Sequence, residues 1–139
     1  MLVGFLLMIL AALPLTSASA CTCAQPASVQ EGLNQSDAVF LGLVERFELK
    51  GSGRLATFRV HTVWKGLEAS RVRVSTGGGD GDCGYHFIVG VKYLVFARQG
   101  AWNTLQTNIC TRTKQASGEA VDDLKALGPG TPVTGRHDD

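Results

Sequence analysis

Four cysteines limit the folds that this 139-residue chain can adopt. Cys21 and Cys23 form a C-x-C pair, whereas Cys83 and Cys110 follow much later in the sequence. An even number of cysteines in an exported domain is typical of a disulfide framework. A bridge between Cys21 and Cys23 would close a strained, very small ring, so we expect each of them to pair with one of the later cysteines. The sequence leaves both such pairings open.

The first 20 residues carry the features of a secretory signal peptide. Residues 2–15 are almost wholly apolar, and this run is shorter than the roughly 20 apolar residues that span a membrane. Ala18, Ser19 and Ala20 match the small-residue pattern that precedes a cleavage site. We therefore expect a mature protein that starts at Cys21, is secreted to an extracellular or periplasmic location, and has no transmembrane segment.

A lipid anchor at Cys21 is the alternative interpretation of this leader. Lipoprotein signals usually carry Leu three residues before the modified cysteine, and this chain has Ala18 there. A lipidated and acylated Cys21 could neither join a disulfide nor present a free amine. The mass of the exported protein therefore distinguishes the two forms.

Composition and motifs argue against several functional classes. The 13 basic and 12 acidic residues nearly balance, whereas a nucleic-acid-binding surface needs a strongly basic face. The sequence has no G-x-S-x-G, H-E-x-x-H or P-loop motif, so we predict neither an enzyme nor a cofactor. A Cys₄ zinc site is disfavoured because the cysteines lack C-x-x-C spacing and the expected compartment is oxidising. Asp80 and Asp82 lie among glycines without the residue order of an EF-hand, which indicates a flexible connector.

Hydrophobic periodicity predicts a mainly β domain over residues 21–128. Alternation along residues 55–64 places Phe58, Val60 and Trp64 on the same, buried face. Trp102 is expected on a strand face as well. The expected strands are residues 38–49, 55–64, 71–75, 91–97 and 102–110.

Short helices are predicted on either side of these strands. Ser28 and Glu31 form a capping box within residues 24–36, and Ser117 is expected to cap a second helix that Gly128 ends. Residues 129–139 have the composition of a flexible tail. The pattern fits best a five-stranded, closed barrel of the OB type with one or two short flanking helices and a disulfide-tethered amino terminus. An open sandwich is the alternative.

Several short motifs occur in the order found in tissue inhibitors of metalloproteinases. They are C-T-C at residues 21–23, V-W-K-G at 63–66, C-G-Y at 83–85, K-Y-L-V-F-A at 92–97, and Cys110. From Cys21 to about residue 127, the chain resembles a minimal, single-domain member of this family, whose domain is the netrin-like module. Leu33 stands where animal members carry a cysteine of a third disulfide, and their carboxy-terminal, three-disulfide subdomain has no counterpart in this sequence.

The resemblance implies an OB-fold barrel and the pairings Cys21–Cys83 and Cys23–Cys110. It also implies that the amino-terminal residues inhibit a zinc metalloprotease. The α-amine and carbonyl oxygen of Cys21 would chelate the catalytic zinc of that protease, and Thr22 would point toward its primed-side specificity pocket. The rest of the implied contact surface is Cys23, Ala24, Gln25 and Asp82.

A netrin-like structural or protein-binding module of the envelope or extracellular space, without protease inhibition, is the alternative interpretation. In that case the disulfides serve only to stabilise the domain. An inhibition assay against zinc proteases, comparing the mature protein with a form extended before Cys21, distinguishes the two functions.

Overall fold

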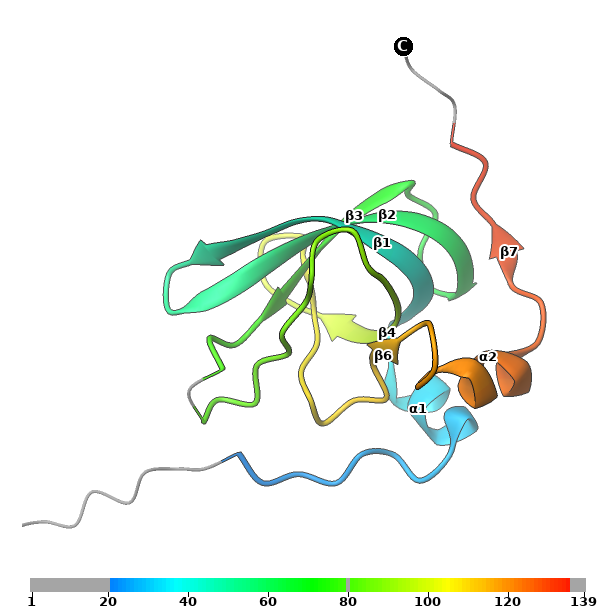
Figure 1. Cartoon of the computed structure of the whole chain (residues 1–139), viewed down its shortest axis with the longest axis horizontal. Helices are drawn as coiled ribbons and strands as arrows, with labels where there is room; N and C mark the ends of the chain where they lie inside the picture. The colour runs from blue at the N-terminus through cyan, green and yellow to red at the C-terminus, as the bar shows by residue number, and fades with distance from the viewer. Residues whose placement is uncertain (1–20, 80, 136–139) are drawn as a thin grey trace, which may run out of the picture.

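The computed structural model describes residues 21–79 and 81–135 (Figure 1). The predicted signal peptide lies outside these residues, as do Asp80 and residues 136–139. The described part is mainly β, as the sequence predicts, with one sheet and two short helices. The elements are α1 (Val29–Gln35), β1 (Ala38–Lys50), β2 (Gly53–Lys65), β3 (Arg71–Thr76), β4 (Lys92–Gln99), β5 (Leu105–Gln106), β6 (Lys114–Gln115), α2 (Val121–Leu127) and β7 (Thr131–Pro132).

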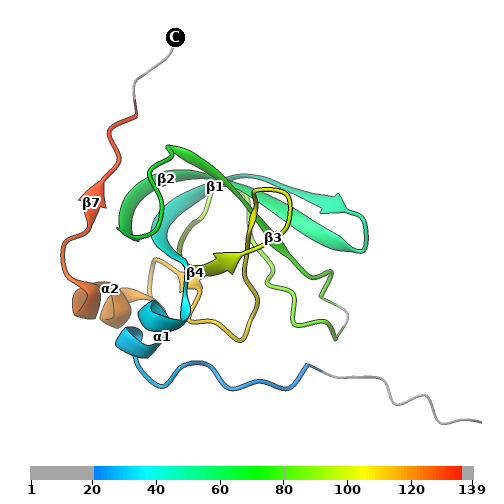
Figure 2. The ribbon, with the colours of Figure 1, turned by 180° about the vertical axis from the view of Figure 1, so that it is seen from behind.

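Five strands are joined in a closed ring of hydrogen bonds. β1 pairs with β2, β2 with β3, β3 with β5 and β5 with β4, while β4 pairs back with β1. Every pair in the ring is antiparallel except β3 with β5. β6 adds to β4, and β7 adds to β2. Figure 2 shows from behind how the long β1 and β2 curve over the shorter strands.

Irregular pairing between β1 and β2 lets these 13-residue strands bend. Their register shifts three times along the pair, and such bulges bend a strand and increase its twist. Gly42 lies at one of these shifts, where an added Cβ would stand 3.1 Å from the carbonyl oxygen of Arg59. Glycine therefore allows the close approach of the two strands that the bend requires.

Aromatic side chains fill the interior of the ring. Phe58 is fully buried, and the rings of Phe40 and Phe87 meet its ring edge-on at centroid distances of 5.5 and 5.1 Å. Phe87 comes from the loop between β3 and β4 and packs edge-on against Tyr93 as well. The Tyr93 hydroxyl in turn accepts the N–H of Ile88 at 3.0 Å, which fixes that loop against the ring.

Helices α1 and α2 cover the outer face of the ring beside β4 (Figures 1 and 2). Leu33 of α1 packs against a second buried cluster that includes Leu94 and Phe96. The Ser28 hydroxyl caps α1 by accepting the N–H of Glu31 at 3.1 Å, which confirms this half of the predicted capping box. The carboxylate of Glu31 accepts the N–H of Ala27 instead of completing the box. The helix starts at Val29, later than the sequence analysis expected.

The alternation predicted for β2 changes phase in the middle of the strand. The register runs from Leu41 opposite Thr62 to Gly42 opposite Val60, so His61 is the extra residue of a bulge. Beyond it, Val63 is buried in the ring core, whereas Trp64 packs against the helices. The prediction that Trp64 shares a face with Phe58 was therefore wrong. The indole N–H donates to the carbonyl of Gly128 at 2.9 Å.

The segment after β4 is less regular than its sequence predicts. Of the strand expected over residues 102–110, only β5 forms. Trp102 and Asn103 both have a φ of 55°, and Trp102 is 92% exposed, so it occupies a loop and not a strand face.

The carboxy-terminal part also departs from the prediction. Ser117 does not cap α2, whose N-cap is Ala120 without a side-chain hydrogen bond. The first residues of the expected flexible tail pair with β2, with Thr131 opposite Val63 and the Val133 N–H donating to the carbonyl of His61.

Candidate functional site

Two disulfides tether the amino-terminal segment, residues 21–27. Cys21 is joined to Cys83 and Cys23 to Cys110, with Cα–Cα distances of 5.1 and 5.5 Å. These are the two pairs that the family resemblance implies. The bridges lie next to each other, and the sulfurs of Cys21 and Cys110 are 4.0 Å apart. The segment is thereby fixed to two loops that lie far away in the sequence.

Hydrogen bonds continue the tether beyond the second bridge. The side-chain amide of Gln25 donates to the carbonyl of Ile109 at 3.2 Å, and Arg112 donates to the carbonyl of Pro26 at 2.7 Å. The side chains of Thr22 and Ala24 are exposed. In Figure 1 the segment runs in an extended course along the lower edge of the molecule. Its backbone is thus held without belonging to a strand, while Thr22 and Ala24 remain free for contact.

Arg112 connects the amino-terminal segment to α2. Its guanidinium donates to both carboxylate oxygens of Asp123, at 2.6 and 3.0 Å, and Lys114 lies 3.3 Å from the same carboxylate. Burial by itself would raise the pKa of Asp123, but the hydrogen bonds and charges of Arg112 and Lys114 outweigh it and lower that pKa below its ordinary value of 3.8. A buried ion pair thus supports the point where the segment enters α1.

Asp82 organises the loop that carries Cys83, residues 77–79 and 81–84. Its carboxylate accepts the N–H groups of Gly78, Gly79 and Gly84 at 2.6, 2.9 and 3.2 Å. These bonds, the one from Gly79 first, lower the pKa of Asp82 below 3.8. The family resemblance implies that Asp82 flanks a protease cleft, and in the structure its carboxylate is hydrogen-bonded within its own loop. The predicted flexible connector thus has internal hydrogen bonds among its described residues, and its flexibility stays a prediction.

The backbone of this loop is tightly folded. Cys83 itself has a φ of 62°, in the left-handed region, and a Cβ on Gly84 would collide with the carbonyl of Gly77. The Thr76 hydroxyl accepts the N–H of Tyr85 at 2.8 Å and closes the base of the loop. Glycine at position 84 and the carboxylate of Asp82 together fix where the Cys83 sulfur points.

Threonine hydroxyls hold the second loop, which carries Cys110. Thr107 and Thr113 both donate to the carbonyl of Phe96, at 2.8 and 3.2 Å, and the Phe96 N–H donates back to Thr113 at 3.0 Å. The Cys110 N–H donates to the side chain of Asn108 at 2.9 Å. The sequence analysis did not identify these residues; the repeated threonines at 107, 111 and 113 were the only signal available.

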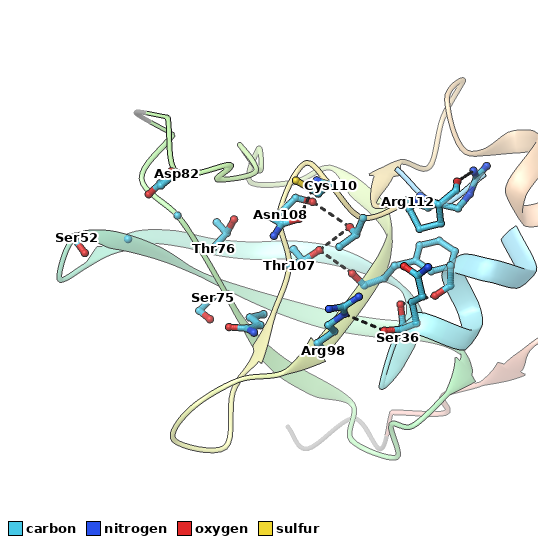
Figure 3. Close-up of a pocket in the computed structure, with 18 residues that line it drawn as sticks. Ser36, Ser52, Ser75, Thr76, Asp82, Arg98, Thr107, Asn108, Cys110 and Arg112 are labelled. Atoms are coloured by element: carbon cyan, nitrogen blue, oxygen red, sulfur yellow. Dashed lines mark hydrogen bonds between the residues drawn. The ribbon is translucent and has the colours of Figure 1, made fainter. Parts of the chain in front are cut away.

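Two hollows flank the tethered segment. A polar groove of about 510 Å³ includes Pro26 and Cys110 among its lining residues, and Figure 3 shows Asp82 at one end and Arg112 at the other. A second hollow of about 490 Å³ is lined by Gln25, Tyr85, Ile109, Thr113, Lys114 and Glu119. Burial, then the nearby Tyr93 and Glu119, raises the pKa of Tyr85 to about 12, so its hydroxyl stays protonated there. The segment and the Cys110 loop contribute to both hollows.

Comparison with known proteins adds no assignment: no protein-family model and no curated protein matches this chain. In residues 21–79 and 81–135, no helix has the length and apolar character that crossing a membrane requires. The disulfides are compatible with a secreted protein.

Proposed function

We propose that this protein is a secreted inhibitor of zinc metalloproteases that acts through its amino terminus. The observation that carries the proposal is the double tether, in which Cys21 and Cys23 are both bridged to loops of the domain. Such a tether presents residues 21–25 as a rigid edge. The likeness of the sequence to tissue inhibitors of metalloproteinases supports the same function.

An OB-type barrel of the netrin-like kind is part of this proposal. The ring of five hydrogen-bonded strands has the strand number of an OB-type barrel, with the helices on its outer face. In a netrin-like module of this kind, the bridges would attach the terminus to the barrel wall. Fold alone does not determine function, so the proposal depends on the geometry of the terminus.

Chelation of zinc explains why the tether matters. A catalytic zinc keeps one position open for water, and a competing ligand can take that position. The α-amine and the carbonyl oxygen of Cys21 can close a five-membered ring on the metal once the leader is removed. Because the two bridges hold Cys21 in place before binding, less conformational entropy is lost when the complex forms.

The neighbouring residues would take different roles in the complex. Thr22 is exposed and would enter the primed-side specificity pocket, and Ala24 would follow along the cleft. Cys23 and Gln25 would contact the protease through their backbone, since Cys23 is bridged and the Gln25 amide donates to Ile109. Asp82 would act from inside its loop by positioning Cys83, and not by direct contact.

An inhibition assay with altered termini tests the proposal. The mature protein, a form with one alanine added before Cys21, and a form acetylated at Cys21 are compared against a panel of zinc proteases. We expect the mature protein to inhibit and both altered forms to lose at least about tenfold in affinity, roughly 1.4 kcal/mol. A form with one alanine added after Asp139 serves as the matched control and inhibits normally. Equal inhibition by all forms would refute chelation by Cys21.

The alternative function makes a different prediction in the same assay. A netrin-like module without protease inhibition would inhibit no member of the panel. This outcome is informative when the mass of the protein shows both bridges and an unmodified Cys21. A lipid on Cys21 would be seen in the same mass measurement and would exclude chelation, because the amine of such a cysteine is acylated.

A further inference from the structure

The four cysteine sulfurs form one compact cluster at the surface. All of them lie within 4.8 Å of one another, although they come from three separate parts of the sequence. Cys23 is exposed and the other three cysteines are half-buried, so solvent reaches the cluster. Cysteine spacing does not predict this cluster, because none of the cysteines has the C-x-x-C spacing of common zinc sites.

The dimensions of the cluster are close to those of a zinc tetrathiolate. Zinc binds thiolates at about 2.3 Å in tetrahedral geometry, which places the sulfurs about 3.8 Å apart. Cys21 and Cys110, which belong to different bridges, already have their sulfurs 4.0 Å apart. In each bridge the sulfurs must separate, and the Cα–Cα distances of 5.1 and 5.5 Å leave room for this by side-chain rotation.

We propose that the reduced protein binds one zinc ion through Cys21, Cys23, Cys83 and Cys110. A phosphine reductant supplies the electrons: for each bridge, one phosphine takes the oxygen of a water molecule and becomes a phosphine oxide, and each sulfur keeps one proton. Zinc then displaces the protons of the thiols that it binds, so binding tightens as pH rises. The ion takes the place of two covalent bridges.

Contacts that do not involve sulfur keep the ligands near one another after reduction. The Ile109 N–H donates to the carbonyl of Cys83 at 2.9 Å, which joins the backbones of the two loops directly. Gln25 and Pro26 are hydrogen-bonded to Ile109 and Arg112, so the segment that carries Cys21 and Cys23 stays beside these loops. Part of the conformational entropy of assembling the site is therefore already lost before the metal binds.

The consequence is a tether that exists in two chemical forms. Oxidised sulfurs hold the amino-terminal segment by two disulfides, and reduced sulfurs hold it by one metal ion. In both forms the same four residues connect the segment to the loops of Cys83 and Cys110. This inference concerns the reduced chain and does not depend on protease inhibition.

Metal titration of the reduced protein tests the inference. The mature protein is reduced with a water-soluble phosphine without oxygen and titrated with Co²⁺, then with Zn²⁺ in competition. We expect one metal per chain, the intense visible absorption of tetrahedral cobalt with thiolate ligands, and displacement of cobalt by zinc. The oxidised protein should bind neither metal. Should reduction unfold the chain, zinc is expected to restore its near-ultraviolet circular dichroism, and failure to do so would overturn the inference.

Variants and a denatured control show whether the folded cluster is the site. Cys83→Ser should weaken zinc binding by the reduced protein at least about tenfold, a change of roughly 1.4 kcal/mol. His86→Ala, which removes an exposed imidazole outside the cluster, should leave zinc affinity unchanged. The reduced chain in urea should bind zinc more weakly than the folded chain. Equal affinity in urea, or an unchanged affinity in Cys83→Ser, would contradict a preassembled site.

Discussion

The ring of strands and the amino-terminal segment are held in place by different kinds of interaction. The ring closes through backbone pairing around a core of buried aromatic side chains. The segment has no regular secondary structure and is held by two disulfides and by single hydrogen bonds from Gln25 and Arg112. The hydrophobic effect thus builds the scaffold, whereas covalent and polar contacts position the part proposed to act.

This difference predicts that stability and inhibition respond to different substitutions. Changes in the ring should lower the free energy of unfolding without altering the geometry of the terminus in molecules that remain folded. Changes in the tether should alter inhibition even where the ring survives.

Phe58→Ala should be the most destabilising single substitution of this set. It leaves a cavity between Phe40 and Phe87 in the fully buried core, and such changes cost about 3–5 kcal/mol. Trp102→Ala removes a larger aromatic ring that is 92% exposed, and should change stability by less than about 0.5 kcal/mol. Denaturant unfolding measures both variants. Similar losses in the two would contradict the assigned core.

Replacing Cys23 and Cys110 together by alanine removes one bridge and should cost about 3 kcal/mol. The ring should still form, because its pairing and core do not involve these residues. Far-ultraviolet circular dichroism and denaturant unfolding measure the two effects separately. We also expect weaker protease inhibition, since Thr22 and Ala24 gain freedom. Complete loss of the β-sheet signal would show that scaffold and tether are not separable.

Arg112→Ala should cost about 2–3 kcal/mol, because it leaves the buried carboxylate of Asp123 with Lys114 alone and the carbonyl of Pro26 without a donor. Lys125→Ala is the matched control, since it removes an exposed cation from α2 and should change stability by less than about 0.5 kcal/mol. Denaturant unfolding and hydrogen exchange of the Ala27 amide measure the effect. Indistinguishable variants would mean that the ion pair does not support the segment.

Acidification should affect inhibition and stability in separate pH ranges. The pKa of Asp123 is lowered in the folded protein, so its contribution to stability is complete above its ordinary value of 3.8 and is lost as pH falls through the lower folded value. The α-amine of Cys21 has an ordinary pKa of about 7.7–8.0, so inhibition should weaken already below neutral pH. The free energy of unfolding and the inhibition of the protease, both measured from pH 8 to about pH 3, show the two pH ranges. Loss of inhibition and loss of stability over the same pH range would contradict this expectation.

Asp82→Asn should have the smallest effect on stability, because the side chain is exposed. The loss of charge should weaken its hydrogen bonds to Gly78, Gly79 and Gly84, and the amides of these residues should exchange faster with solvent. Asp122→Asn, an exposed carboxylate on α2, is the control. Unchanged exchange in the Cys83 loop would show that Asp82 does not organise it.

The strands of the ring were largely predictable from the sequence, because the patterns that mark them involve residues close together in the chain. Alternation in β2, where side chains two residues apart share a face, and the apolar runs of β1 and β4 identify these strands. Ser28 marked the start of α1 and Gly128, with a φ of 69°, the end of α2. The bulge at His61 left no such mark, and so the face of Trp64 was misassigned.

The contacts of the tether could not be predicted in the same way, because they join residues far apart in the sequence. Arg112 donates to Pro26 across 86 positions, and Gln25 to Ile109 across 84. Neither pair forms a motif. Asp82 illustrates the same limit over a shorter distance. The family resemblance implied a contact residue, but only the folded loop shows three N–H groups donating to its carboxylate.

The visible spectrum of a cobalt-substituted zinc protease, recorded as the mature protein is added, tests chelation by the amino terminus most directly. When an amine and a carbonyl oxygen replace water on the metal, the ligand-field absorption of cobalt shifts, and we predict this shift for the mature protein but not for the form acetylated at Cys21. Inhibition of that protease with an unchanged cobalt spectrum would contradict the mechanism.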